Sequence, residues 1–136
     1  MKLYFVIPGD PMAKQRPRVT RKGIAYTPSQ TVNYETLVKQ MFYTTYPDHV
    51  PGTGPIKTVI SAYFPIPSSW STKKQQAALM GNMRPTGKKD WDNIGKIVTD
   101  ALNRIAYMDD GQIVDGRVCK HYTDVPRVEV YIEELS

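Results

Sequence analysis

Two acidic pairs flank one amphipathic segment in the carboxyl-terminal half of the chain. Asp90 and Asp92 begin the segment, Lys96 follows four residues after Asp92, and Asp109-Asp110 lie in the turn beyond it. If the chain folds back at that turn, three carboxylates converge beside one ammonium group. Oxygen-only clusters of this kind suit Mg²⁺ or Mn²⁺, the ions that drive phosphodiester chemistry. The spacing therefore indicates a metal-dependent reaction on phosphates.

The segment between the acids has the periodicity of a helix. Its apolar residues fall at steps of three and four and define one face: Ile94, Ile97, Val98, Ala101, Leu102 and Ile105. Asp90 or Asp92 is well placed to cap this helix and to lie in the positive field at its amino terminus. At the helix start Asp90 is still in extended backbone, so it can turn toward the same point as Asp92. Asp92 and Lys96 share one face of the helix.

The other elements must build a sheet and helices that carry this segment. The pattern predicts an α+β fold in a single compact domain (1–136), with a small mixed β-sheet packed against helices in the order β-loop-α-β-α-α-β-β. The expected elements are a strand at 3–7, a basic loop at 12–26, a helix from Thr27-Pro28-Ser29 to about Tyr46 with Val32, Leu37, Val38, Met41 and Phe42 at helical spacing, a strand at 57–64, a helix from Ser71 to about Met80, the helix starting at Asp92, and strands at 112–122 and 127–133.

Composition restricts the functional classes. The chain has 136 residues, 18 Lys and Arg against 13 Asp and Glu, and a net charge of +5. Only Asp10, Glu35 and Asp48 precede Asp90, so the amino-terminal half is strongly basic and the acids collect late. Basic surface around an acidic cluster is what a metal-dependent nuclease requires, and it favours a polyanionic partner.

Cysteine and hydropathy exclude other classes. Cys119 is the single cysteine, which excludes an internal disulfide and a cysteine-based zinc site, and two histidines argue against a histidine-rich metal site. No run approaches the roughly 18 apolar residues of a membrane span. We therefore expect a soluble cytoplasmic protein with no membrane partner, associated with the nucleoid when it acts.

Each acidic element also has an ordinary structural explanation. Asp92 can be a helix cap, Lys96 its ion-pair partner, and Asp109-Asp110 a turn. A calcium loop that starts at Asp90 fails, because Ile94 would occupy a ligand position and Ala101 the place of the bidentate glutamate.

The conjunction of the elements resembles a known family, the RusA-type Holliday-junction resolvases. The resemblance is carried by Asp90-Trp91-Asp92-Asn93-Ile94-Gly95-Lys96, Asp100-Ala101-Leu102-Asn103 and Asp109-Asp110-Gly111-Gln112-Ile113, which stand in the family's order and spacing. It extends to Lys14-Gln15-Arg16-Pro17-Arg18 and Tyr26-Thr27-Pro28, which are similar to a subset of these proteins. Residues 47–84 match nothing recognisable.

The resemblance implies a crossover junction endodeoxyribonuclease of DNA recombination and repair. Such an enzyme is a homodimer that depends on Mg²⁺, for which Mn²⁺ can substitute. It nicks two opposed strands of branched DNA at a four-way junction and leaves a 5′-phosphate and a 3′-hydroxyl. By position, Asp90, Asp92 and Asp110 correspond to catalytic, metal-holding carboxylates and Lys96 to the essential lysine. Asp109 and Asp100 belong to the motif as weaker candidates, and for Asp100 we expect a structural role, holding neighbouring backbone groups.

Basic residues near both motifs are candidate DNA contacts. Lys14, Arg16 and Arg18 lie in the proline-stiffened loop, and Arg84, Lys88 and Lys89 lead directly into Asp90. A solvated surface loop is the plainer explanation of the first group, whereas the second would meet the strand being cut. Trp91 between the two acids suits stacking on a base or sugar, and packing under the helix start is equally compatible with the sequence.

Two other functions stay open at the level of sequence. A flap- or branch-cutting nuclease could use the same acidic site on other substrates. A non-catalytic DNA-binding protein could carry the same acids in structural roles. Metal-dependent cleavage separates the last from the nucleases, and a panel of branched substrates separates the two nucleases. The sequence also leaves open whether the protein serves a cell or a prophage, a frequent setting for this family.

Overall fold

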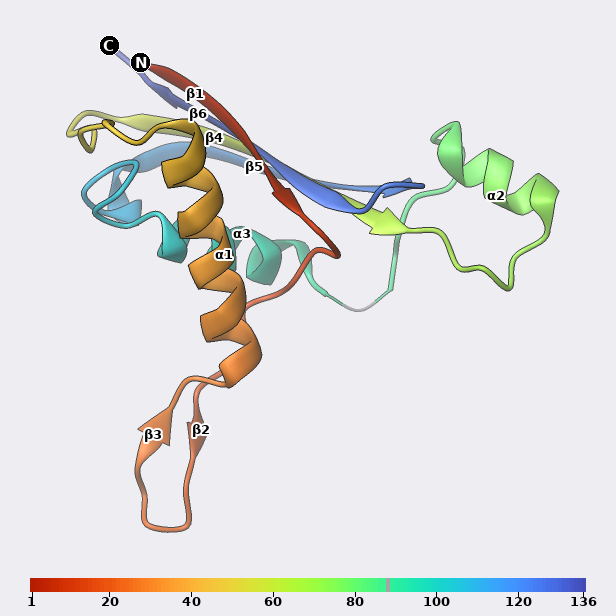
Figure 1. Cartoon of the computed structure of the whole chain (residues 1–136), viewed down its shortest axis with the longest axis horizontal. Coiled ribbons are helices and arrows are strands. Elements are labelled where there is room, and N and C mark those ends of the chain that lie inside the picture. The colour runs from red at the N-terminus through yellow and green to blue at the C-terminus, as the bar shows by residue number, and fades with distance from the viewer. Residues whose placement is uncertain (88) are drawn as a thin grey trace.

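A four-stranded mixed sheet forms the centre of the molecule. The computed structural model describes residues 1–87 and 89–136. The sheet consists of β1 (Lys2–Pro8), β4 (Ile56–Pro65), β5 (Ile113–Thr123) and β6 (Arg127–Glu134). Its spatial order is β1-β6-β4-β5, with β4 and β5 parallel and the other neighbours antiparallel (Figure 1). The predicted α+β class, with a small mixed sheet, is confirmed.

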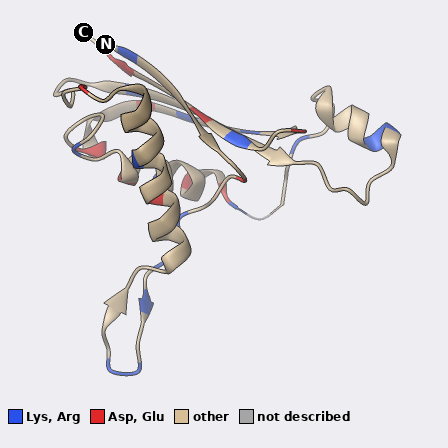
Figure 2. Ribbon diagram, viewed as in Figure 1, with Lys and Arg blue, Asp and Glu red and all other residues tan. Residues whose placement is uncertain are grey.

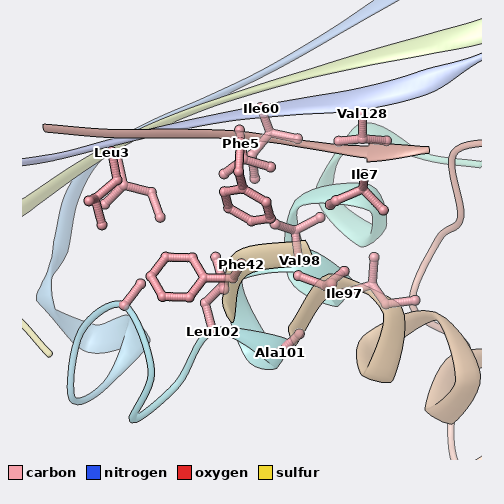
Figure 3. Close-up of a cluster of buried hydrophobic side chains, with 14 of the residues drawn as sticks. Leu3, Phe5, Ile7, Phe42, Ile60, Ile97, Val98, Ala101, Leu102 and Val128 are labelled. Atoms are coloured by element: carbon pink, nitrogen blue, oxygen red, sulfur yellow. The ribbon is translucent and has the colours of Figure 1, made fainter. Parts of the chain in front are cut away.

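Two helices cover one face of this sheet. They are α1 (Ser29–Thr45) and α3 (Trp91–Ala101), which pack against each other below the strands (Figure 1). Figure 3 shows the core between the layers, where Phe5 and Ile7 of β1 meet Phe42 of α1 and Ile97 of α3. All the predicted α3 face is buried except Ile105, which lies beyond the helix and is half-buried. None of the described helices is long and apolar enough to cross a membrane.

The first helix is confirmed, and most of the residues at helical spacing face the core: Val38 and Phe42 are buried, and Leu37 and Met41 pack against the core. Val32 shares this spacing but is 47% exposed. The buried stripe is Thr31, Tyr34, Val38 and Phe42, at steps of three and four. The hydroxyl of Thr31 is bonded to Gln15 (Oγ1 to Oε1, 3.2 Å), so a polar residue can occupy this buried position.

The prediction that residues 12–26 form an irregular basic loop is wrong in part, because some of these residues form a short hairpin. The hairpin pairs β2 (Arg18–Val19) with β3 (Ala25–Tyr26) and projects from the body (Figure 1). Thr20 and Gly23 close its turn: the Gly23 amide donates to the Thr20 carbonyl (2.9 Å), and Gly23 adopts φ +80°. Prolines exclude a helix here, but they leave two-residue strands free to pair on either side of a turn.

A long connection, residues 66–90, joins β4 to α3. It carries α2 (Thr72–Leu79), whose amino terminus is capped by the Ser71 hydroxyl, which accepts from the Lys74 amide at 3.2 Å. The helix predicted from Ser71 is thereby confirmed. It projects beyond one end of the sheet, away from the hairpin (Figure 1).

Candidate active site

The amino terminus of α3 carries the first acidic pair. Asp90 is the N-cap residue, with extended backbone (φ −64°, ψ 143°), and its side chain makes no capping hydrogen bond. Asp92 lies in the first turn, where its carboxylate accepts from the Asn93 amide at 3.0 Å. Both carboxylates therefore lie at the positive end of the α3 dipole.

The second acidic pair lies in a rigid turn. The short 3-10 helix η1 (Asp110–Gln112) begins with a capping box: the Asp109 carboxylate accepts from the Gly111 amide at 2.8 Å, and the Gln112 side chain returns to the Asp109 amide at 2.8 Å. The Gln112 amide group also donates to the carbonyls of Gly52 (3.0 Å) and Gly54 (2.9 Å). Asp109 is thus engaged in its own turn, whereas Asp110 is left to face α3.

Asp92 and Asp110 line one cavity of about 260 Å³ between α3, η1 and β5. Gly95 makes the close approach of α3 to β5 there, because a Cβ at this position would lie 3.0 Å from Cγ2 of Val118. Trp91 also lines the cavity and is 62% exposed, so it is not packed under the helix start. The structure therefore brings together one acid from each pair, with an exposed indole at the rim.

Negative charge is concentrated around Asp110. Partial burial, the charge of Asp100, a hydrogen bond with the Asp100 carboxyl and the charge of Asp109 all raise the pKa of Asp110 above its ordinary value, and Lys96 opposes the rise. The same three acids, after burial, raise the pKa of Tyr107, whose hydroxyl donates to the Thr99 carbonyl at 2.7 Å. A divalent cation would relieve this repulsion, and the oxygen donors are those that Mg²⁺ and Mn²⁺ prefer.

Lys96 reaches the same group of charges from the next turn of α3. Its Nζ lies 3.6 Å from Oδ2 of Asp100, and its side chain is 59% exposed. The same Asp100 oxygen lies 3.4 Å from Nζ of Lys14, which also contacts Oε2 of Glu35 at 3.0 Å. Asp100 therefore contacts charged side chains beside Asp110, whereas the backbone contacts that we expected for it are not found among the described residues.

Asp90 does not join the other two acids in this structure. It lines an adjoining hollow together with Met12, Gln15, Lys89 and other residues. Within residues 1–87 and 89–136, no three acidic, histidine or cysteine side chains form a group that could hold a metal alone. The expected convergence of Asp90, Asp92 and Asp110 is thus present only as the Asp92–Asp110 pair. Mg²⁺ commonly binds proteins through one or two carboxylates and completes its shell with waters and substrate phosphates.

The expected DNA contacts lie in different environments. Arg16 and Arg18 are exposed at the base of the hairpin, which carries much of the basic charge of this part of the chain (Figure 2). Lys89 has a positive φ of 72° and donates to the Pro11 carbonyl at 2.7 Å, so it ties the entry to α3 to the amino-terminal loop. Arg84 is exposed and donates to the Lys120 carbonyl at 2.6 Å. Lys88 lies outside the described residues.

Sequence reasoning missed two residues that border this region. Glu35 holds Lys14, and Arg117 lines the cavity from the edge strand β5. The sequence offered a signal for Glu35, because it is the only acidic residue between Asp10 and Asp48 and so a natural partner for the cations of the basic loop. No sequence pattern could place Arg117 at the cavity, because its position there depends on the packing of β5 beside α3.

Comparisons with known proteins match the chain to a family and to a relative of similar length. The model of the family described as endodeoxyribonuclease RusA matches residues 8–133. The chain is also 39% identical, over 98% of its own length and 97% of the relative's, to a Bacillus subtilis (strain 168) protein named "Uncharacterized protein YqaN". The family match spans the hairpin, both acidic pairs and Lys96.

Proposed function

Because the chain belongs to the RusA endodeoxyribonuclease family, we propose that it is a divalent-metal-dependent endonuclease that resolves four-way DNA junctions by paired, symmetric nicks. The observation that carries the proposal is the cavity that Asp92 and Asp110 line together. Two carboxylates from different elements at one cavity, in a site with surplus negative charge, suit a hard cation that a DNA phosphate helps to bind.

Asp92 and Asp110 would hold Mg²⁺ or Mn²⁺, and we propose Asp90 as the third carboxylate. When bound, such an ion lowers the pKa of the attacking water and neutralises charge on the phosphate. Asp90 has extended backbone and makes no capping hydrogen bond, so the helix terminus does not hold its side chain, which can rotate toward the strand that enters the site. Asp109 holds the turn that presents Asp110.

Lys96 stabilises the reacting phosphate. Its ammonium group is more than half exposed and lies beside the acids, so it can approach an equatorial phosphate oxygen while Asp100 supports it from behind. A compact cation at this place stabilises the charge that develops on a pentacoordinate phosphorus. In-line attack of water on phosphorus, with the bond to the 3′ oxygen breaking and that oxygen taking up a proton, would leave a 5′-phosphate and a 3′-hydroxyl.

The DNA follows the basic surface of the molecule. We propose that Arg16 and Arg18, at the base of the projecting hairpin, contact phosphates, together with three basic residues before α3: Arg84, Lys88 and Lys89. The exposed Trp91 at the rim of the cavity suits stacking on a base or sugar of the cut strand. The hairpin is well placed for a duplex arm because it extends away from the body (Figures 1 and 2).

Assembly as a homodimer would match the substrate. A four-way junction has two-fold symmetry, and resolution needs nicks in two strands of like polarity. One chain with one acidic site makes one nick at a time, whereas a C₂ dimer presents two identical sites related by the symmetry of the substrate.

A panel of branched substrates tests the proposal. Purified protein should nick a synthetic four-way junction at symmetric positions in Mg²⁺ or Mn²⁺, with ligatable ends, and should be inactive in EDTA. Asp90→Asn, Asp92→Asn, Asp110→Asn and Lys96→Ala should each abolish nicking while junction binding survives. Preference for flaps or forks over junctions would support the branch-cutting alternative. Metal-independent binding with no cleavage of any substrate would instead make this a DNA-binding protein whose acids are structural.

A further inference from the structure

Lys14 points into the protein, unlike the other cations of the basic loop. Its ammonium group lies between Glu35 of α1 and Asp100 of α3, at 3.0 Å and 3.4 Å, and its side chain is 21% exposed. The two carboxylates are 17% and 20% exposed. A lysine held by two half-buried acids from different helices has little freedom to reach a phosphate on the surface.

The backbone at this position is fixed to both helices as well. The Lys14 amide donates to the Asn93 carbonyl in the first turn of α3 at 2.8 Å, and the next amide, of Gln15, donates to the Thr31 hydroxyl of α1 at 3.3 Å. Lys14 is therefore inserted between α1 and α3 by main chain and side chain together. Arg16 and Arg18, two and four residues later, are exposed.

Asp100 links this lysine to the reacting groups. Its Oδ2 is shared by Lys14 and Lys96, and its charge and hydrogen bonding are among the causes that raise the pKa of Asp110. Without Lys14, the full charge of Asp100 would act on two neighbours. It would draw the Lys96 ammonium inward, away from a phosphate, and it would repel Asp110 more strongly.

We propose that Lys14, oriented by Glu35, is a positioning residue that neutralises Asp100, so that Lys96 and Asp110 stay directed toward the scissile phosphate. The inference rests on the proposed nuclease function of this site. It gives Lys14 a role other than the phosphate contact expected from its place in the sequence. The segment from Lys14 to Arg18 would then contain cations with two roles. Lys14 positions groups of the active site, and Arg16 and Arg18 contact DNA phosphates.

The salt dependence of binding distinguishes the two roles. Junction affinity is measured in EDTA over a range of salt, for wild type, Lys14→Ala and the matched control Arg16→Ala. Arg16→Ala should reduce the slope by about one unit, as the loss of one phosphate contact does. Lys14→Ala should keep the wild-type slope. A reduced slope for Lys14→Ala, equal to that of Arg16→Ala, would overturn the proposal.

Kinetics at saturating DNA test the positioning itself. Lys14→Ala should lower the single-turnover rate of nicking by roughly tenfold to a hundredfold, the usual effect of removing a residue that supports metal-site groups. Lys14→Arg should recover most of the rate, because it restores a cation between the two acids. Asp100→Asn added to Lys14→Ala should also raise the rate above that of Lys14→Ala alone, since the charge that needed neutralising is gone. If neither change restores the rate in variants that melt like wild type, the proposal is wrong.

Metal binding by the DNA-free protein tests the same coupling without any cleavage. Deleting one nearby, partly screened positive charge should tighten Mn²⁺ binding about threefold to tenfold in Lys14→Ala. The gain should shrink in the Asp100→Asn background. Equal Mn²⁺ affinity in Lys14→Ala and wild type would refute the coupling. If wild type binds Mn²⁺ and shows this pattern but cuts no junction, the proposed function fails while the role of Lys14 stands.

Discussion

Gln112 should be essential for holding the turn that presents Asp110. Its Oε1 accepts from the amides of Met108 and Asp109, both at 2.8 Å, and its Nε2 donates to the carbonyls of Gly52 and Gly54. One side chain thereby joins the η1 turn to the loop before β4. The change Gln112→Ala removes all four hydrogen bonds at once.

The expected loss of stability follows from these bonds. A typical hydrogen bond contributes about 0.5 to 1.5 kcal/mol net to folding. The two bonds to the amides are exposed and belong at the low end of that range, whereas the two to Gly52 and Gly54 are part-buried. We therefore expect Gln112→Ala to lower the free energy of unfolding by roughly 2 to 4 kcal/mol. Cleavage should fall as well, because Asp110 loses its fixed place opposite Asp92.

Urea unfolding and single-turnover cleavage, measured on the same preparations, check both effects. The matched control is Gln40→Ala on the exposed side of α1, which should change stability by no more than about 0.5 kcal/mol. Gln112→Glu keeps the oxygen acceptor but places a negative charge near Asp110 and donates nothing to the two carbonyls, so it should not rescue. A loss below about 0.5 kcal/mol for Gln112→Ala, within the range of ordinary surface changes, would refute this account of the turn.

Three further predictions follow from the charges and the symmetry. In EDTA at pH 7, Asp110→Asn should melt above wild type: burial and Asp100 raise the pKa of this carboxyl, so its ionisation opposes folding. The gain in stability of Asp110→Asn should appear as the pH rises from the ordinary aspartate pKa of 3.8 through the raised pKa of Asp110, and it should be absent below pH 3.8. A melting temperature below that of wild type at pH 7 would contradict the assignment. Arg16→Ala with Arg18→Ala should weaken binding to all branched DNAs alike and flatten the salt dependence by about one unit per contact, and an unchanged slope would assign the hairpin to solvent. Mixed dimers of wild-type and Asp92→Asn subunits should nick one strand without resolving the junction, and symmetric paired cuts by a monomer would exclude the dimer.

The elements were predictable where one residue pattern decides the structure. The α3 face from Ile94 to Leu102 and the alternation of Val128, Val130 and Ile132 both follow from burial on one side. The hairpin at residues 18–26 was not predicted, because its two-residue strands are too short for a period and are set by a local turn. In α1, Val32 is exposed although it shares the helical spacing of Val38 and Phe42, and the neighbouring Thr31 is buried because it has a hydrogen-bonding partner in the loop.

The acids of the candidate site were predictable in identity but not in arrangement. Spacing selected Asp92 and Asp110, which the fold brings to one cavity. It could not show that Asp90 lines a different hollow, because that depends on the direction of one side chain at the N-cap. The contacts of Lys14 with Glu35 and Asp100 join residues 21 and 86 positions apart, and such pairs arise only when α1 packs on α3.

Mn²⁺ titration of the DNA-free protein tests most directly the central claim that Asp92 and Asp110 hold one metal between them. We expect Asp92→Asn and Asp110→Asn each to weaken Mn²⁺ binding by at least about tenfold, because losing a direct ligand should cost no less than losing an outer-shell partner. The double variant should bind little more weakly than either single one, because one ligand alone already leaves the site ineffective. Asp48→Asn, an exposed acid outside the site, should bind as wild type does. Wild-type Mn²⁺ affinity in either Asp92→Asn or Asp110→Asn would contradict the claim.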